Sequence, residues 1–82
     1  MPSFPDRLKE LRKTKGATQK AMAEYLGMAE RSYRRYEAGD LEPNHETTIK
    51  LADYFNVSLD YLTGRTNYSI DADGNITAKT LG

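Results

Sequence analysis

Four glycines divide the first part of the chain into short segments; they stand at positions 16, 27, 39 and 64. Apolar residues recur between them at helical spacing, as Phe4, Leu8 and Leu11 do at i, i+4 and i+7. Glycine often ends a helix, and Ser, Thr and Asn often begin one. The sequence therefore predicts an all-α domain over residues 3–64. Its five short helices are expected over residues 4–15, 19–26, 29–38, 45–55 and 59–63.

Residues 65–82 have a different pattern, in which apolar residues fall at every second position as in a strand; they are Tyr68, Ile70, Ala72, Ile76 and Ala78. A two-residue turn at Asp73-Gly74 would place the two apolar sets on opposite faces. A three- or five-residue loop pairs residue 70 with 78 and 72 with 76, which unites the two sets on one face. We therefore expect a short C-terminal β-hairpin with the longer loop. An extended, disordered tail is the alternative.

The composition argues against several classes of protein. The chain has no cysteine and a single histidine, His45, so neither a disulfide framework nor a zinc site is expected. No apolar run approaches the ~20 residues that cross a bilayer, and the start of the chain lacks a signal-peptide pattern, so we expect a cytoplasmic protein. No catalytic triad, paired-carboxylate pocket or glycine-rich phosphate loop is recognisable. An enzyme is thus the least expected class, and no cofactor, metal or small-molecule ligand is implied.

The net charge is zero, but the charges are unevenly distributed. Residues 1–40 hold nine Lys and Arg against six Asp and Glu, whereas residues 41–82 hold three against six. A local electric field matters more than the net charge when a protein binds a polyanion. The asymmetry therefore leaves a nucleic-acid partner open.

The stretch "AERSYRRYEAG" concentrates basic and aromatic residues. At helical spacing, Arg31, Arg34 and Arg35 fall on one side of the helix, and Tyr33 and Tyr36 fall on another. One side is strongly basic and the other can be buried. Such a helix is either an ordinary solvated surface or one that contacts a negatively charged partner.

Residues 18–39 have the dimensions of a helix-turn-helix, with a tight turn at Gly27 and a small residue, Ala23, where the helices cross. The segment "TQKAMAEYLGMAERSYRRYEAG" resembles the helix-turn-helix of the lambda-repressor-like, Cro/C1-type (XRE family) transcriptional regulators of bacteria and phages. The resemblance extends through "RLKELRKTKG", Pro43 and "LADYFNVSLDYLTG". It covers residues 4–64 and leaves the tail outside.

This resemblance implies a five-helix bundle whose third helix lies in the major groove of DNA. Three residues match positions where family members contact base edges: Glu30, Arg31 and Arg35. A second set matches positions that contact the DNA backbone or flank the base-reading residues: Gln19, Ala29, Ser32, Arg34, Ala38, Asp40, Asn44 and His45. Arg12 and Glu37 match a structural ion pair that links the first and third helices.

The chain departs from the family pattern at three positions. Ala29 replaces the usual Ser or Thr, so the third helix loses a side-chain cap worth about 1 kcal/mol. Glu30 brings a negative charge towards the DNA, where it accepts a hydrogen bond from cytosine N4 or holds Arg34 in place at i, i+4; otherwise it repels phosphate. Tyr33 replaces the usual Ile or Val, and we expect its ring to pack inward with the hydroxyl at the edge of the core.

The resemblance thus implies a bacterial or phage transcriptional regulator, with repression the expected mode, that binds double-stranded DNA. One helix reads only a few base pairs, so we expect a homodimer on a roughly palindromic site, with recognition helices about 34 Å apart. A two-stranded hairpin is marginal alone and requires the helical body or a second chain, so the tail and the fifth helix are the candidate dimer surfaces. The alternative is a protein-interaction module or antitoxin-like component whose helix-turn-helix is mainly a scaffold.

Overall fold

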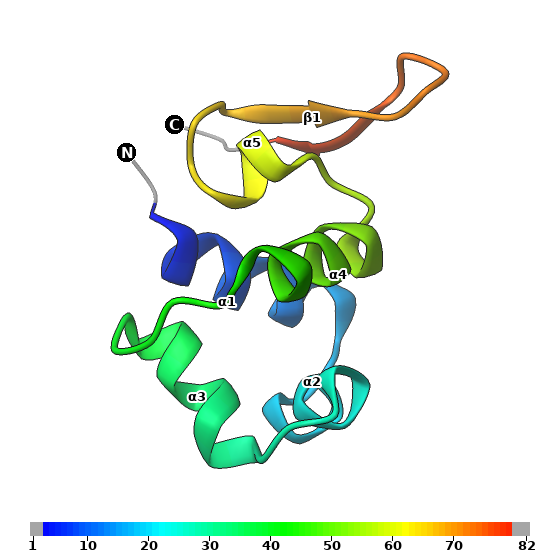
Figure 1. The fold of residues 1–82 in the computed structure, drawn as a ribbon. Coiled ribbons are helices and arrows are strands. Elements are labelled where there is room, and N and C mark those ends of the chain that lie inside the picture. The colour runs from blue at the N-terminus through cyan, green and yellow to red at the C-terminus, as the bar shows by residue number, and fades with distance from the viewer. Residues whose placement is uncertain (1–2, 80–82) are drawn as a thin grey trace.

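Five helices followed by a two-stranded antiparallel hairpin form the computed structural model, which describes residues 3–79 (Figure 1). The elements are α1 (Phe4–Lys15), α2 (Gln19–Leu26), α3 (Glu30–Ala38), α4 (His45–Phe55), α5 (Leu59–Leu62), β1 (Tyr68–Ile70) and β2 (Ile76–Lys79). The predicted helices are confirmed to within one residue at each end. The tail forms the hairpin rather than an extended segment, and its predicted end, residues 80–82, lies outside the described residues.

Short polar side chains begin three of the helices. Thr18 Oγ1 accepts a hydrogen bond from the Ala21 N–H at 3.0 Å, and Asn44 Oδ1 accepts one from the Thr47 N–H at 2.8 Å. Ser58 begins α5 in the same way. The residues that follow α1, α2 and α3 are glycines with φ between 69° and 81°, a region that other residues adopt at a cost. These local signals explain why the helix boundaries are readable from the sequence.

The hydrophobic core lies between the helices. Its buried members are Leu8, Met22, Ala23, Tyr33, Tyr36, Leu51, Ala52, Phe55 and Leu62. Ala23 is 2% exposed and faces the crossing of α2 with α3, where its small side chain allows the two helices to approach closely. Both α3 tyrosines are buried, so the interior side of this helix is fixed against the body.

Tyr33 differs from the expectation in one respect. Its ring packs inward, but the expectation that the hydroxyl reaches the edge of the core is wrong, because the whole side chain is 0% exposed. The hydroxyl oxygen is buried and has no hydrogen-bond partner of ordinary geometry. Glu37 of α3 and its partner Arg12 of α1 lie near this hydroxyl, and their side chains are themselves largely buried.

The hairpin pairs in a register other than the predicted one. Ser69 pairs with Ala78 and Ile70 pairs with Ile76, with a bulge between them. The predicted pairs, 70 with 78 and 72 with 76, are therefore wrong. The bulge places an extra residue, Thr77, on β2 and shifts the strands against each other.

The loop chemistry explains the shift in register. The Asp71 carboxylate accepts hydrogen bonds from the backbone N–H groups of Asp73 and Asn75, at 2.9 Å and 3.0 Å. Aspartate commonly organises a turn in this way. The loop therefore begins at Asp71, one residue before Ala72, and Ala72 cannot serve as a strand residue.

Two buried polar residues attach the hairpin to the helical body. The Arg7 guanidinium is 0% exposed and donates to the carbonyls of Tyr61 at 2.7 Å and Thr66 at 2.9 Å. The same group lies 4.0 Å above the centre of the Tyr61 ring. Ser69, which is 2% exposed, accepts a hydrogen bond from the Ser58 N–H at 2.7 Å. The hairpin is therefore an integral part of the fold, and its attachment fixes which face is turned outward.

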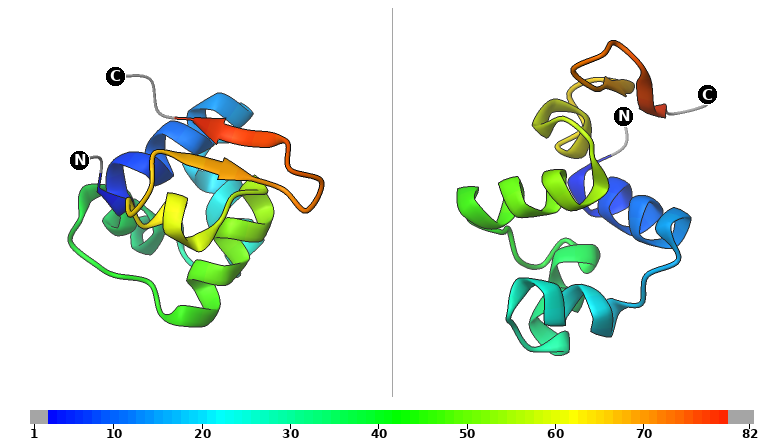
Figure 2. Two further views of the ribbon diagram at one scale, coloured as in Figure 1. Left: turned by 90° about the horizontal axis from the view of Figure 1, so that it is seen from above. Right: turned by 90° about the vertical axis from the view of Figure 1, so that its right-hand side faces the viewer.

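The long axis of the molecule separates two ends. Its extents are 35 × 24 × 24 Å, and in Figures 1 and 2 the hairpin with α5 lies at one end while α2 and α3 lie at the other. Across residues 3–79, no helix combines the length and the apolar character that a membrane span requires.

Replacement of Arg7 by lysine tests its role. Lysine keeps the charge but cannot reach several acceptors with a planar fork, so we expect Arg7→Lys to lower the free energy of unfolding by about 2–3 kcal/mol. Arg65→Lys is the matched control, since the Arg65 side chain is exposed, and it should change stability by less than about 0.5 kcal/mol. Urea denaturation of both variants measures the difference. Equal stability of Arg7→Lys and the parent chain would contradict this role.

Candidate nucleic-acid interface

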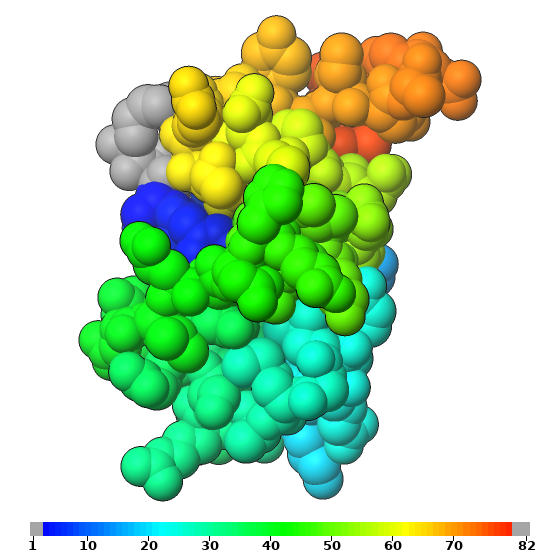
Figure 3. Space-filling model, viewed as in Figure 1, coloured from blue at the N-terminus to red at the C-terminus, as the bar shows by residue number. Residues whose placement is uncertain are grey.

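The outward side of α3 is basic. Arg31, Arg34 and Arg35 are exposed, while Tyr33 and Tyr36 on the opposite side are buried. In the space-filling view, α2 and α3 form the lower end of the molecule (Figure 3). The arrangement follows from helical spacing together with the burial of the two rings, and it places three guanidinium groups on one helix surface.

Intramolecular contacts distinguish these arginines from one another. Arg34 forms an ion pair with Glu30 one turn earlier, which is the second of the two roles considered for that carboxylate. Arg35 donates from Nη2 to the Asp40 carbonyl at 3.5 Å, a long and weak contact. Arg31 makes no ion pair or side-chain hydrogen bond within residues 3–79. Arg31 and Arg35 thus retain most of their donors for an external acceptor.

The flanking residues form a rim around α3. Ala29 and Ala38 stand exposed at its two ends, and Ser32 is half-buried. Asp40, Asn44 and His45 are exposed along the connection to α4 and at the start of that helix. Asn44 uses its side-chain oxygen as the α4 cap, so a contact from this residue would come from its amide NH₂. The N–H groups in the first turns of α2 and α4 are the kind of donors that bind phosphate oxygens.

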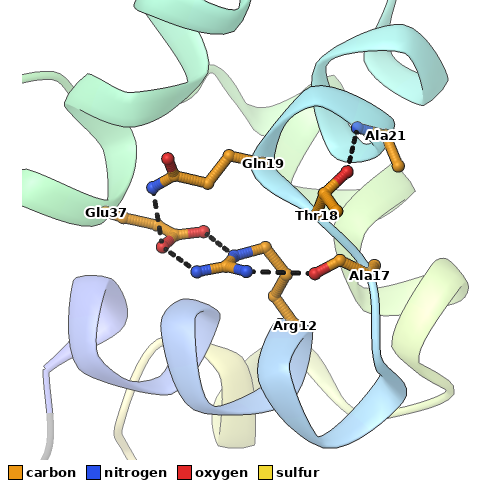
Figure 4. A network of polar contacts seen from close by, with 6 residues as sticks. All are labelled: Arg12, Ala17, Thr18, Gln19, Ala21 and Glu37. Atoms are coloured by element: carbon orange, nitrogen blue, oxygen red, sulfur yellow. Dashed lines mark hydrogen bonds and ion pairs between the residues drawn. The ribbon is translucent and has the colours of Figure 1, made fainter.

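Gln19 is placed differently from the other flanking residues. Its side chain is half-buried and its Nε2 donates to Glu37 Oε1 at 3.3 Å (Figure 4). The sequence pattern did not single out the neighbouring Lys20, which is exposed in the first turn of α2 and adds a positive charge at this end. The position of Lys20 two residues after the Thr18 cap could have pointed to it in the sequence. Its exposure, however, depends on how α2 is rotated against the core.

Behind this surface, Arg12 of α1 and Glu37 of α3 form a two-point ion pair. The distances are 2.7 Å from Nε to Oε2 and 3.1 Å from Nη2 to Oε1, and Nη1 donates to the Ala17 carbonyl at 3.0 Å (Figure 4). The side chains are only 12% and 4% exposed. With Gln19, the pair ties α1, the start of α2 and α3 together, so it fixes the position of α3 relative to the body.

The ionisation of this cluster favours the charged pair. The hydrogen bond to Glu37 raises the pKa of Arg12. Burial by itself raises the pKa of Glu37, but the hydrogen bonds from Arg12 and Gln19, together with the positive charge of Arg12, outweigh burial, so the net pKa lies below the usual value. Burial, and then the adjacent Glu37 carboxylate, raises the pKa of Tyr33. At neutral pH the pair is therefore ionised and the phenol is neutral.

Comparison with known proteins identifies a family and individual relatives that this chain resembles. A family model described as helix-turn-helix matches residues 8–62, which include α3 and every residue predicted to contact DNA. The SPbeta prophage-derived HTH-type transcriptional regulator YonR of Bacillus subtilis is 40% identical over 70 residues, which cover 85% of this chain and 65% of that protein. This chain spans about three fifths of the length of the curated relatives that it matches.

Two solved structures share the fold. A transcriptional regulator from Listeria innocua has 34% sequence identity and a TM-score of 0.75, with 78% of this chain and 60% of that chain covered. The DNA-binding domain of the P22 c2 repressor has 27% identity and a TM-score of 0.67, with 73% and 79% covered. The family match ends at residue 62, before the hairpin begins.

Glu37→Gln should destabilise the protein in a pH-dependent manner. At neutral pH it leaves the Arg12 guanidinium without its anion, and we expect a loss of about 3 kcal/mol in the free energy of unfolding. The Glu37 pKa is lowered in the folded state, so the stabilisation is present above the ordinary value of 4.5 and is lost as pH falls through the folded value. The difference in the free energy of unfolding between the parent chain and the variant should therefore become smaller in acid. Glu24→Gln, at an exposed site, is the control, and a pH-independent gap would refute the assignment.

Ala29→Ser should supply the missing cap of α3, where no side chain caps the first turn. We expect the free energy of unfolding to rise by about 1 kcal/mol, since serine accepts a hydrogen bond from the first-turn N–H groups. Ala38→Ser, at the other end of the helix, should give no gain. Thermal denaturation of the two variants compares them directly, and equal effects would exclude capping as the cause.

Proposed function

This chain belongs to the helix-turn-helix family of Cro/C1-type transcriptional regulators, and from that premise we propose that it is a repressor that binds double-stranded DNA through α3. The observation that carries the proposal is the division of α3 into a buried tyrosine side and an exposed side with three arginines. In a helix-turn-helix the second helix enters the major groove, where exposed side chains meet base edges.

Arg31 and Arg35 are the proposed base-reading residues. They lie one turn apart on the same side of α3, and neither is held by a carboxylate within residues 3–79. An arginine fork donates to guanine O6 and N7 at once, and each such contact is worth about 1–3 kcal/mol of discrimination. Glu30 has a supporting role in this arrangement: paired with Arg34, it orients that guanidinium towards the phosphates at the groove wall.

Contacts to the DNA backbone would come from the rim. The exposed starts of α2 and α4 present N–H groups, and Lys20, Asn44 and His45 lie beside them. Phosphate contacts fix the orientation of the protein on the duplex but carry no sequence information. In this arrangement, Gln19 acts indirectly, by holding the Glu37 carboxylate that positions α3.

We further propose a homodimer on a roughly palindromic site. Two copies related by a two-fold axis would place their α3 helices about 34 Å apart, on one face of the duplex. The two ends of the molecule constrain the dimer surface, since both α3 helices must face the same DNA. The exposed side of α5, which includes Leu59, is the proposed dimer surface.

A second candidate function is protein binding with the helix-turn-helix as scaffold. The zero net charge and the Glu30–Arg34 pair favour it, because both reduce the attraction to a polyanion. The two functions differ in salt dependence. A protein that contacts several phosphates loses affinity for DNA steeply as salt rises, whereas a scaffold has a shallow slope.

Selection of bound duplexes from a random DNA pool at near-physiological salt tests the proposal. Enrichment of an inverted repeat, with half-site centres about one helical turn apart, would support specific binding by a dimer. An absence of enrichment over the starting pool, with a monomeric mass in the same buffer, would refute it and favour the scaffold.

Substitutions on α3 should separate base reading from phosphate binding. Arg31→Ala and Arg35→Ala should each lower the ratio of specific to nonspecific affinity by about 1–3 kcal/mol. Lys20→Ala should instead weaken binding to all duplexes evenly and reduce the salt slope by about one. Arg65→Ala, outside the interface, is the control. Fluorescence anisotropy with the selected duplex and a scrambled one measures both quantities, and an even loss for the arginine variants would show that they hold phosphates.

A further inference from the structure

The outward face of the hairpin, formed by Tyr68, Ile70 and Ile76, is apolar and exposed. Ser69 points to the body, so its neighbours on β1 point away from it, and Ile70 lies directly opposite Ile76 on β2. Their exposures are 55%, 52% and 63%. Of the six large apolar side chains that are exposed within residues 3–79, three lie on this small surface. Scattered exposed apolar residues are ordinary, but a contiguous set indicates an interaction site.

We infer that this face packs against the same face of a second copy of the chain, and that the contact joins molecules bound to separate DNA segments. The self-association depends only on the hairpin. Its consequence for DNA rests on the proposed function of α3.

The charges around the face are complementary to themselves under a two-fold axis. Asp71 and Asp73 lie at the loop end of the hairpin, and Lys79 lies at the other end beside Tyr68. When two such faces stack with their strands antiparallel, the lysine end of one copy meets the aspartate end of the other. Opposite charges at the rim set the orientation of an interface and disfavour wrong partners. The same aspartates repel DNA phosphates and anionic lipid, which makes either a poorer occupant.

The attachment of the hairpin determines what this contact does. The outward face is turned away from the helical body, and α2 and α3 lie at the far end of the 35 Å long axis (Figures 1 and 2). Face-to-face packing therefore puts the two bodies on opposite sides of the paired hairpins. The two α3 helices then lie at opposite ends of the assembly and cannot enter adjacent half-sites about 34 Å apart on one duplex face. The contact suits the bridging of two DNA segments.

The size of the face sets the strength of the contact. Three side chains about half exposed bury far less than the ~800 Å² per partner of a stable interface. The free protein should thus self-associate weakly through this face. Two copies held near each other by DNA gain a high effective concentration, and the same contact then becomes significant.

Dilution of the free protein tests the contact without DNA. We expect the backbone amide signals of residues 67–79 to shift with concentration between about 10 μM and 1 mM, the range of a weak interface. The double variant Ile70→Glu, Ile76→Glu should abolish the shifts without lowering the melting temperature, because both positions are exposed. Ile49→Glu, at an exposed apolar site on α4, is the matched control and should retain them. Absence of shifts in the parent chain would overturn the proposal.

Charge reversal tests the orientation of the contact. Lys79→Asp alone and Asp73→Lys alone should each reduce the shifts at least threefold, and both leave the Asp71 carboxylate that organises the loop in place. The double variant that exchanges the two charges should restore the shifts. Failure of restoration would reject the antiparallel, two-fold arrangement.

A capture assay tests bridging. One copy of the duplex obtained by selection is fixed to beads, and a second, labelled copy is offered in solution. The parent chain and Ile49→Glu should retain the labelled duplex, whereas the Ile70→Glu, Ile76→Glu variant should bind the fixed duplex and lose at least 80% of the second. Normal binding to the fixed duplex with equal retention by all three chains would overturn the bridging role. Loss of binding to the fixed duplex by the parent chain would count against the proposed function instead.

Discussion

The ion pair between Arg12 and Glu37 is the interaction on which the geometry of the basic surface depends. It joins α1 to α3 with two short contacts, and its remaining donors and acceptors bind the Ala17 carbonyl and Gln19 at the start of α2 (Figure 4). A buried ion pair stabilises only when its hydrogen-bonding groups are satisfied, and here most of them are. The Tyr33 hydroxyl, buried near this pair, has no hydrogen-bond partner of ordinary geometry.

A second buried guanidinium, that of Arg7, has a different kind of hydrogen-bond partner. It has no carboxylate within hydrogen-bond distance among residues 3–79, and carbonyl oxygens of α5 and the following segment surround it instead. Arg12 thus organises the α2–α3 end and Arg7 organises the hairpin end. Both guanidinium groups are withdrawn from the surface, whereas the exposed arginines of α3 form a local basic surface on a chain of zero net charge.

The two ends have different kinds of surface because the fold turns different sides outward. α3 buries its tyrosines and exposes arginines, whereas the hairpin buries Ser69 and exposes Tyr68, Ile70 and Ile76. A basic helix suits DNA, and an apolar sheet face suits protein. The distance between them makes it physically reasonable for one small chain to hold DNA at one end and another copy at the other.

The helices, their caps and the basic side of α3 follow from the sequence alone, because residues within a few positions of one another determine them: Thr18, Asn44 and Ser58 act on the next turn. The alternation of apolar residues in the tail also predicts the hairpin. It does not predict the register, because the loop at Asp71 and the bulge at Thr77 decide it. Other features depend on residues that are far apart in the chain. They are the burial of Arg7, the burial of the Tyr33 hydroxyl and the hydrogen bond from Gln19 to Glu37. Only tertiary packing decides such contacts, because a local pattern specifies which side of an element is apolar but not which partner will cover it.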